Sequence, residues 1–342
     1  FIFISHNCFH FSSSDNQTID HSSGDEVAEK LIRTFSLFMY CMITVVGTVG
    51  NGLVIYVTGF KMKKTVNSVW FLNLALADFL FTAFLIFSAV SLYQEYHWPF
   101  GNFMCKLNSF VSVVNMFASV FFLTAINLDR CLSTLVVVWA QNERTVHKAQ
   151  IMSAIIWLAA GICSTPQTYF RTLVPGEGNR TFCMYDNSTM TEEQKWGLYT
   201  FRFVVGFLVP FMVMLFSYLA IGIRSRRLQQ MKKQISHRII CFIVAAFFIC
   251  WLPFHVLSFM ELTFPNYKKL QKIGGPLTMS LAFLNSCLNP ILYVFIRVDF
   301  QDKLHQSVCF VLEHALEEDH LSSTFRSVPS RAARKSESSS PI

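Results

Sequence analysis

Asp78 is the residue whose type and surroundings point most clearly to chemistry. It is the one charged residue in the apolar stretch Val69–Val90. A charge at mid-bilayer depth costs about 2.5–3.5 kcal/mol on insertion scales, so its presence there indicates a function. Polar side chains also occur at mid-span positions of other apolar stretches: Asn51, Asn115, Ser119, Asn285, Ser286 and Asn289. Together they predict a Na⁺ ion or a water held by oxygen atoms, or a hydrogen-bonded network without an ion. We expect no other cofactor.

Two arginines occupy positions where an unpaired charge is costly. Arg130 follows Asp129 at one end of an apolar stretch, where its long side chain reaches water. No acidic residue stands near the start of the sixth stretch, where His237 and Arg238 occur, so we expect Asp129 to be the resting partner of Arg130. Arg202 lies inside another stretch and faces either a water-filled pocket or the membrane interface.

Seven apolar segments must position these residues. They cover approximately residues 35–60, 68–93, 103–134, 149–170, 197–223, 236–261 and 273–296. Each reaches the roughly 20 residues that a helix needs to cross a bilayer, and none alternates with the period of two typical of a membrane β-barrel. Hydrophobic residues make up 53% of the chain and charged residues 14%, against about 25% in an average soluble domain. The sequence predicts an all-α membrane protein with a seven-transmembrane helix bundle.

The distribution of basic residues predicts the orientation. Most Lys and Arg residues fall in the odd-numbered loops and the C-terminal segment, which places that side in the cytoplasm. The N-terminus is then extracellular and the protein a multi-pass component of the plasma membrane, in contact with membrane lipids. Three Asn-x-Ser/Thr acceptors, Asn16, Asn179 and Asn187, all fall on the predicted outer side, which favours glycosylation there.

The same pattern divides the chain into four parts. Residues 1–34 are an extracellular tail and residues 35–296 the seven-helix bundle. Residues 297–313 carry Phe300, Leu304, Val308 and Leu312 at intervals of four, which is typical of an amphipathic helix on the membrane surface. Residues 314–342 form a Ser-rich cytoplasmic tail that we expect to be disordered and phosphorylated.

Several short motifs occur in order on successive segments. They are Gly50-Asn51, Leu74-Ala75-Leu76-Ala77-Asp78, Asp129-Arg130-Cys131, Trp157, Pro210 with Tyr218, Cys250-Trp251-Leu252-Pro253 and Asn289-Pro290-Ile291-Leu292-Tyr293. In this register the chain resembles the rhodopsin-like G-protein-coupled receptors. Within that class it is similar to the formyl peptide receptor family, over about residues 30–310. The stretches that carry this likeness include Trp98-Pro99-Phe100-Gly101, Cys105-Lys106-Leu107, Val138-Trp139-Ala140-Gln141-Asn142 and Phe283–Pro290.

The resemblance implies a mechanism of signal transfer. An extracellular ligand would bind above Trp251 and swing the inner end of the sixth helix outward at the Pro253 kink. Tyr218, Tyr293 and Arg130 would then rearrange, aided by the Pro290 kink, and a heterotrimeric G protein of the inhibitory class would dock, leading to calcium mobilisation. The likeness also implies a disulfide between Cys105 and Cys183 in place of two free thiols, which suits an oxidising outer compartment. It implies a chemotactic or chemosensory role.

The candidate ligand pocket departs from the family pattern. Receptors of formylated peptides carry an acid on the third helix and two arginines one turn apart on the fifth. Here the acid position holds Val113 and one arginine position holds Leu198, while Arg202 is kept. We expect Arg202, with Phe254 and His255 beside the Pro253 kink, to bind a peptide carboxylate or carbonyl. A more apolar peptide or a lipid-like ligand is expected, with a weak response to short formyl-Met peptides.

Other classes of membrane protein fit less well. A retinal protein needs a lysine in the seventh segment, where Ile273–Ile296 has none. No internal repeat suggests a transporter, no His-Glu-x-x-His or Gly-x-Ser-x-Gly motif suggests an enzyme, and no nucleic-acid partner is expected. The remaining alternative is a receptor-like or scavenger protein that binds ligand without signalling through a G protein.

The position of Arg130 leads to the first prediction. If its guanidinium forms part of the surface that binds the G protein, Arg130→Ala should preserve ligand binding and reduce nucleotide exchange on the G protein. Ligand-binding and exchange assays on the same membranes measure the two effects. Normal exchange in this variant would contradict the role.

Overall fold

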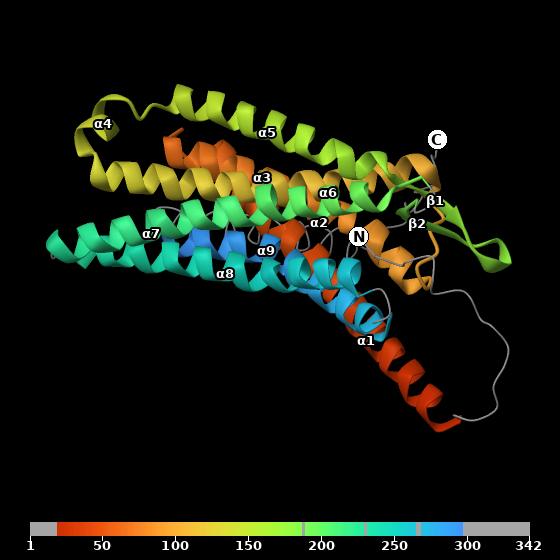
Figure 1. Ribbon diagram of the computed structural model, residues 1–342. Coiled ribbons are helices and arrows are strands. Elements are labelled where there is room, and N and C mark those ends of the chain that lie inside the picture. The colour runs from red at the N-terminus through yellow and green to blue at the C-terminus, as the bar shows by residue number, and fades with distance from the viewer. Residues whose placement is uncertain (1–18, 187–188, 229–230, 265–267, 297–342) are drawn as a thin grey trace, which may run out of the picture.

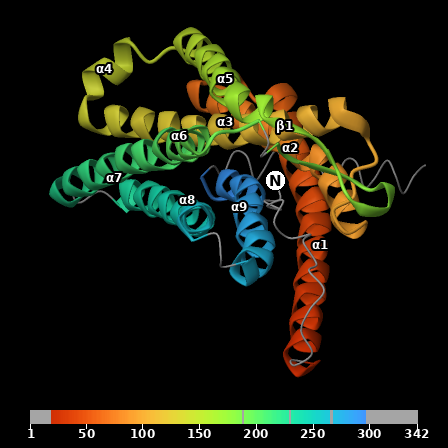
Figure 2. The same ribbon diagram turned by 45° about the vertical axis from the view of Figure 1, so that its right-hand side comes forward.

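The computed structural model describes residues 19–186, 189–228, 231–264 and 268–296. Its long helices are α1 (Ile19–Tyr56), α2 (Val66–Tyr93), α3 (Gly101–Leu135), α5 (Val146–Tyr169), α7 (Val209–Leu228), α8 (Met231–Thr263) and α9 (Lys268–Ile296). They run alongside one another as a bundle (Figures 1 and 2). The predicted surface helix 297–313, the tail 314–342, Asn16 and Asn187 lie outside the described residues.

The predicted helical membrane fold is confirmed. Within the described residues, six helical units are long and apolar enough to cross a bilayer, and they correspond to the first six predicted segments. The seventh predicted segment lies in α9, whose 29 residues also exceed the length that a crossing needs. The fifth crossing is continuous through α6 (Glu192–Phe203), a π-helical segment η4 (Val204–Leu208) and α7. This irregularity comes just before Pro210, which lacks a backbone N–H to donate.

Threonine caps set the start of three helices. Thr65 precedes α2, and its hydroxyl accepts from the Ser68 backbone N–H while Ser68 Oγ accepts from the Thr65 N–H, a capping box. Thr145 caps α5, and Thr191 forms a second capping box with Gln194 at α6. Each cap satisfies amide groups that have no partner inside the helix.

Two features differ from the sequence expectation. α1 begins at Ile19, so residues 19–34 of the predicted tail are helical and continue the first crossing outward. Another short helix, α4 (Val137–Asn142), and a β-hairpin interrupt loops for which the sequence analysis predicted no structure. The apolar pattern did not reveal these elements because it reports burial in lipid, and they lie between the crossings.

The hairpin pairs β1 (Arg171–Pro175) antiparallel with β2 (Thr181–Tyr185). Its turn contains a 3₁₀ segment, η3 (Glu177–Asn179), in which Gly178 has φ +65°, a left-handed conformation that glycine adopts without strain. Asn179, one of the three predicted glycosylation acceptors, is exposed in this turn. Figure 1 shows the hairpin at one end of the bundle and α4 at the other. We call these the disulfide end and the Arg130 end.

Three contacts fix the hairpin over the disulfide end. Cys183 on β2 forms the disulfide with Cys105 on α3, as the family resemblance implied. The Trp98 backbone N–H donates to Thr181 O at 2.8 Å, and Thr181 Oγ1 donates to Trp98 O at 2.9 Å. The hairpin is thereby attached to α3 and to the loop before it.

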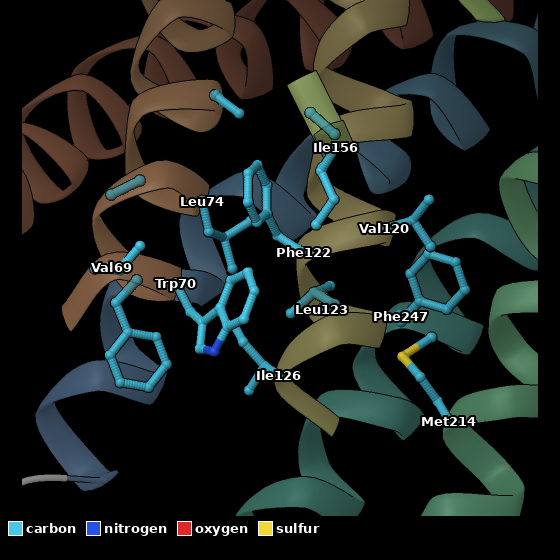
Figure 3. Close-up of a cluster of buried hydrophobic side chains, with 14 of the residues drawn as sticks. Val69, Trp70, Leu74, Val120, Phe122, Leu123, Ile126, Ile156, Met214 and Phe247 are labelled. Carbon is cyan, nitrogen blue, oxygen red and sulfur yellow. The ribbon is translucent and has the colours of Figure 1, made fainter. Parts of the chain in front are cut away.

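The bundle core lies where α2, α3, α5, α7 and α8 meet (Figure 3). Trp70 packs against Phe122, and Phe122 packs edge-on against Trp157. The Trp157 indole N–H donates to Asn73 Oδ1 at 2.9 Å, which joins α5 to α2. Aromatic packing and one partly buried hydrogen bond therefore hold the fourth crossing against the second.

The disulfide provides a test of the hairpin's role. Removing a native disulfide from a small domain typically costs 2–5 kcal/mol, so Cys183→Ser should lower both surface expression and the melting temperature of the detergent-purified protein. Cys41→Ser is the matched control, because Cys41 is free and exposed on α1. Alkylation of both Cys105 and Cys183 in the unreduced native protein would contradict the pairing.

Candidate functional site

A pocket opens near the disulfide. Its lining comes from α3, α5, both hairpin strands, α6, α8 and α9. The lining residues are Ser109, Ser112, Val113, Met116, Gln167, Arg171, Tyr185, Arg202, Trp251, Phe254, Met279 and Phe283. Most are apolar or aromatic, and the polar groups among them are few, which is typical of a small-ligand or peptide-end site.

Two buried arginines dominate the electrostatics of this pocket. Arg171 is 3% exposed, and its Nη1 donates to Cys183 O at 3.0 Å while the guanidinium lies 4.2 Å from the centre of the Tyr185 ring. Arg202 is 5% exposed, and its Nη2 donates to Ser258 Oγ at 3.1 Å.

The positive charges of Arg171 and Arg202 repel each other. Burial lowers the pKa of Arg171, and the positive charge of Arg202 contributes in the same direction. Glu261 on α8 interacts electrostatically with both arginines. The pocket therefore keeps a net positive charge in a poorly hydrated setting, where an anionic ligand group is favoured.

Four of the five predicted ligand-binding residues line the pocket: Val113, Arg202, Trp251 and Phe254. His255 instead lies behind it, 1% exposed, with its ring 5.5 Å and 5.1 Å from the ring centres of Phe203 and Phe207. Leu198, at the position of the missing arginine, is buried against Met190 and Tyr199.

The sequence analysis did not include Arg171, Gln167 or Tyr185 in the site. A signal for Tyr185 was present, because it follows Cys183 by two residues and the disulfide brings that strand to α3. Arg171 lies opposite Tyr185 in the hairpin register, so pairing of the two strands adds the second cation.

The predicted polar residues in the middle of the bundle do form a network. Asp78 is 0% exposed, and its carboxylate accepts from Ser119 Oγ at 3.0 Å, from Asn115 Nδ2 at 3.5 Å and from Asn289 Nδ2 at 2.6 Å. Asn115 Nδ2 also donates to Ser286 Oγ at 3.2 Å. The carboxylate thus joins α2, α3 and α9 through neutral donors.

The network extends to α1. Asn51 Nδ2 donates to Gly47 O at 2.9 Å and to Ser286 O at 3.0 Å. Asn285 is buried on the same turn of α9 as Ser286. Asn51 Oδ1 is buried without a hydrogen-bond partner among the described residues.

The chemistry of this network fits a monovalent cation. One carboxylate, the hydroxyls of Ser119 and Ser286 and the amide oxygens of Asn115 and Asn51 are hard oxygen ligands of the kind Na⁺ takes. No cluster of three or more His, Cys, Asp or Glu side chains that would hold a transition metal occurs in the described part of the chain. A bound Na⁺ would supply the positive charge that the neutral donors lack, and Asp78 would hold it.

A third cluster lies at the Arg130 end. Asp129 Oδ1 accepts from Arg144 Nε and Oδ2 from Arg144 Nη2, both at 2.8 Å. The structure therefore shows an ion pair of this carboxylate with Arg144, a partner that the sequence analysis did not predict. Arg144 escaped that analysis because it follows α4, 15 residues further along the chain.

The sequence analysis also assigned two prolines and two tyrosines to activation: Pro253, Pro290, Tyr218 and Tyr293. Pro253 and Pro290 lie inside α8 and α9, where each removes a helical hydrogen bond. Tyr218 packs on α7 at the edge of the core. The side chain of Tyr293 lies outside the described part of the structure.

The structure combines a bundle of membrane-crossing helices, a pocket lined in part by a disulfide-held hairpin and, at the opposite end, the ion pair of Asp129 and Arg144. Together these features define a class of membrane receptor. The family described as "7 transmembrane receptor (rhodopsin family)" matches residues 50–293, and the chain belongs to this family of G-protein-coupled receptors. It is a multi-pass membrane protein and not an enzyme. Receptors of this family bind an extracellular ligand and a heterotrimeric G protein.

Among individual proteins, the chain is similar to several chemerin-like receptors. The chain is 38% identical to chemerin-like receptor 1 of Sus scrofa over 308 residues, which cover 85% of this chain and 84% of that receptor. It is 38% identical to chemerin-like receptor 2 of Homo sapiens over 318 residues, 91% and 89% of the two chains. It is 40% identical to chemerin-like receptor 1 of Homo sapiens over 309 residues, 85% and 82%.

The Asp78 network leads to a prediction about sodium. A ligand that binds the folded state at ten times its Kd stabilises it by about 1.4 kcal/mol. The purified wild type should therefore melt at a higher temperature in NaCl than in choline chloride of equal concentration, and Asp78→Asn should remove the difference. If sodium raised the melting temperature of the variant by the same amount, or did not raise that of the wild type, these residues would form a hydrogen-bonded network without an ion.

Proposed function

We propose that this chain is a cell-surface receptor of the chemoattractant type, with an extracellular N-terminus and a cytoplasmic C-terminus. It senses an extracellular peptide or lipid-like ligand and activates a G protein of the inhibitory class, with calcium mobilisation and a chemotactic or chemosensory role. Receptor kinase and arrestin act on its Ser-rich tail. The observation that carries the ligand assignment is the pair of buried arginines, Arg171 and Arg202, in a pocket that is otherwise largely apolar.

The pocket favours a ligand with an anionic group next to an apolar body. A guanidinium offers two parallel N–H donors to a carboxylate, and such charged hydrogen bonds are worth about 1.5–3 kcal/mol each. Ser109 supplies a further hydroxyl donor on α3, while Met116, Phe254 and Phe283 present apolar surface. A peptide with a free C-terminal carboxylate, or a lipid acid, has this combination of groups.

The relatives and the pocket both support a peptide ligand. The matched receptors are named for chemerin, so chemerin is the first ligand to test. The likeness to formyl peptide receptors supports a peptide ligand as well. It does not support formyl recognition, because Val113 stands at the position of the acid and Leu198 at that of the second arginine.

A screen of calcium and cAMP responses in cells expressing the chain tests this proposal. The panel contains chemerin-type, formylated and non-formylated peptides, each with a free carboxylate and as the C-terminal amide, together with lipid acids. Agonists should be found among the free acids, and amidation should weaken them. Ligand that binds without any response, with any heterotrimer, would instead favour the scavenger alternative.

Variants of the two arginines give a sharper prediction. Arg171→Gln and Arg202→Gln should each weaken a carboxylate agonist by roughly 10- to 100-fold, the equivalent of one charged hydrogen bond. Neither should alter its amide form to that extent. Arg180→Gln is the matched control, since Arg180 is exposed in the hairpin turn and lies outside the pocket. A potent response to a formylated tripeptide that Arg202→Ala leaves unchanged would contradict this reading of the pocket.

A further inference from the structure

Two polar side chains in the wall of the pocket are buried with a polar atom left unpaired. Ser109 is 2% exposed and Gln167 is 1% exposed, and both line the pocket. Ser109 Oγ and Gln167 Nε2 have no hydrogen-bond partner among the described residues. An unpaired polar group in a buried position costs free energy, so a ligand that pairs with these two groups gains affinity.

The hydroxyl of Ser109 is not used by its own helix. Ser112 lies three residues further along the same face of α3, and its hydroxyl donates to Asn108 O at 2.8 Å, four residues back. On α5, the hydroxyl of Ser164 donates in the same way to Ala160 O at 2.6 Å. Of these three buried hydroxyls, that of Ser109 is the one left for a ligand.

Both unpaired groups are linked closely to Arg171. Gln167 is the last buried residue of α5 and precedes Arg171 by four residues. Cys183, whose carbonyl oxygen accepts from Arg171 Nη1, is bonded to Cys105, which lies one turn before Ser109 on α3. A carboxylate site at Arg171 therefore adjoins two further hydrogen-bonding groups, one from α5 and one from α3.

We propose that Ser109 and Gln167 are specificity-determining residues that bind a carbonyl oxygen next to the anionic group of the ligand. The proposal rests on the proposed carboxylate site and names its ligand class, an acid with an amide group beside the carboxylate. Gln167 Nε2 and Ser109 Oγ donate to the amide oxygen while Arg171 binds the carboxylate. An unsubstituted fatty acid has methylene groups at this place and leaves both donors unpaired. A site built for a hydrogen bond discriminates strongly against an analogue that lacks it.

Affinity selection on the purified full-length receptor in lipid nanodiscs tests the assignment. One pool of probes contains N-octanoyl amino acids with free carboxylates, and a second contains straight-chain fatty acids of matching length. A third pool of N-acetylated tripeptide acids distinguishes the end of a peptide from an acylated amino acid. Mass spectrometry quantifies what the receptor retains beyond empty nanodiscs. The wild type should retain at least one amide-containing pool about tenfold more strongly than the fatty acids.

Variants of the two residues should change this preference. Gln167→Leu and Ser109→Ala should each reduce the ratio of amide-containing to fatty acids by roughly threefold to tenfold, the equivalent of one neutral hydrogen bond. Retention of the fatty acids should stay within about twofold, because they do not use the donor that is removed. Thr168→Val is the matched control, since the Thr168 hydroxyl donates to Ser164 O at 3.0 Å and lies outside the pocket lining.

The melting temperature of each variant shows whether it is folded, and Ser109→Ala alone decides if Gln167→Leu does not fold. A ratio that the variants leave unchanged, or a wild type that retains fatty acids as strongly as the amide-containing acids, would overturn the proposal. If the wild type retains none of the pools, or if Arg171→Gln leaves retention unchanged, the carboxylate site itself fails. That outcome is distinct from the others.

Discussion

The buried carboxylate of Asp78 is the constraint around which the bundle is arranged. A charge placed there without partners would be far too costly in a low-dielectric interior, so other helices must supply its hydrogen bonds. Ser119 and Asn115 do so from α3 and Asn289 from α9, while Asn51 attaches α1 to the same turn of α9. Four helices therefore meet at fixed heights along the bundle, and a shift of any of them breaks a hydrogen bond to a buried group.

The third helix connects this constraint to both ends of the molecule. It contributes Ser112 and Val113 to the pocket, Asn115 and Ser119 to the Asp78 network and Asp129 to the cluster at the other end. The disulfide at Cys105 fixes the pocket end of this helix to the hairpin. A ligand that moves the pocket walls therefore acts on a rigid element that also carries the network and the Asp129 pair. The structure thus provides discrete hydrogen-bonded elements, which is what two-state switching requires.

The sequence predicted the parts of the structure that depend on local patterns. Apolar segments longer than a bilayer crossing identified the helices, and costly mid-span polar residues identified the Asp78 network before any contact was known. Contacts between distant loops were beyond this reasoning. Tyr185 and Arg171 enter the pocket because two strands pair, and Arg144 reaches Asp129 because α4 turns the chain back; neither arrangement leaves a periodic signal. The early start of α1 was missed because helical structure continues past the point where hydrophobicity ends.

Arg171, the second arginine of the pocket, alters the charge balance that Val113 and Leu198 alone would give. These two residues are the positions at which the chain departs from the formyl peptide receptor pattern. Judged from α3 and the fifth crossing alone, Val113 and Leu198 remove one charge of each sign and leave the local balance unchanged. The hairpin adds Arg171 to the same pocket, so two cations are present where the acid of α3 is missing. Glu261 on α8 interacts electrostatically with both. The two cations belong to the walls of a largely apolar cavity, where the attraction of a positive charge for an anion is little screened by water. The second cation of the pocket therefore comes from a residue outside the helices on which the family motif is defined.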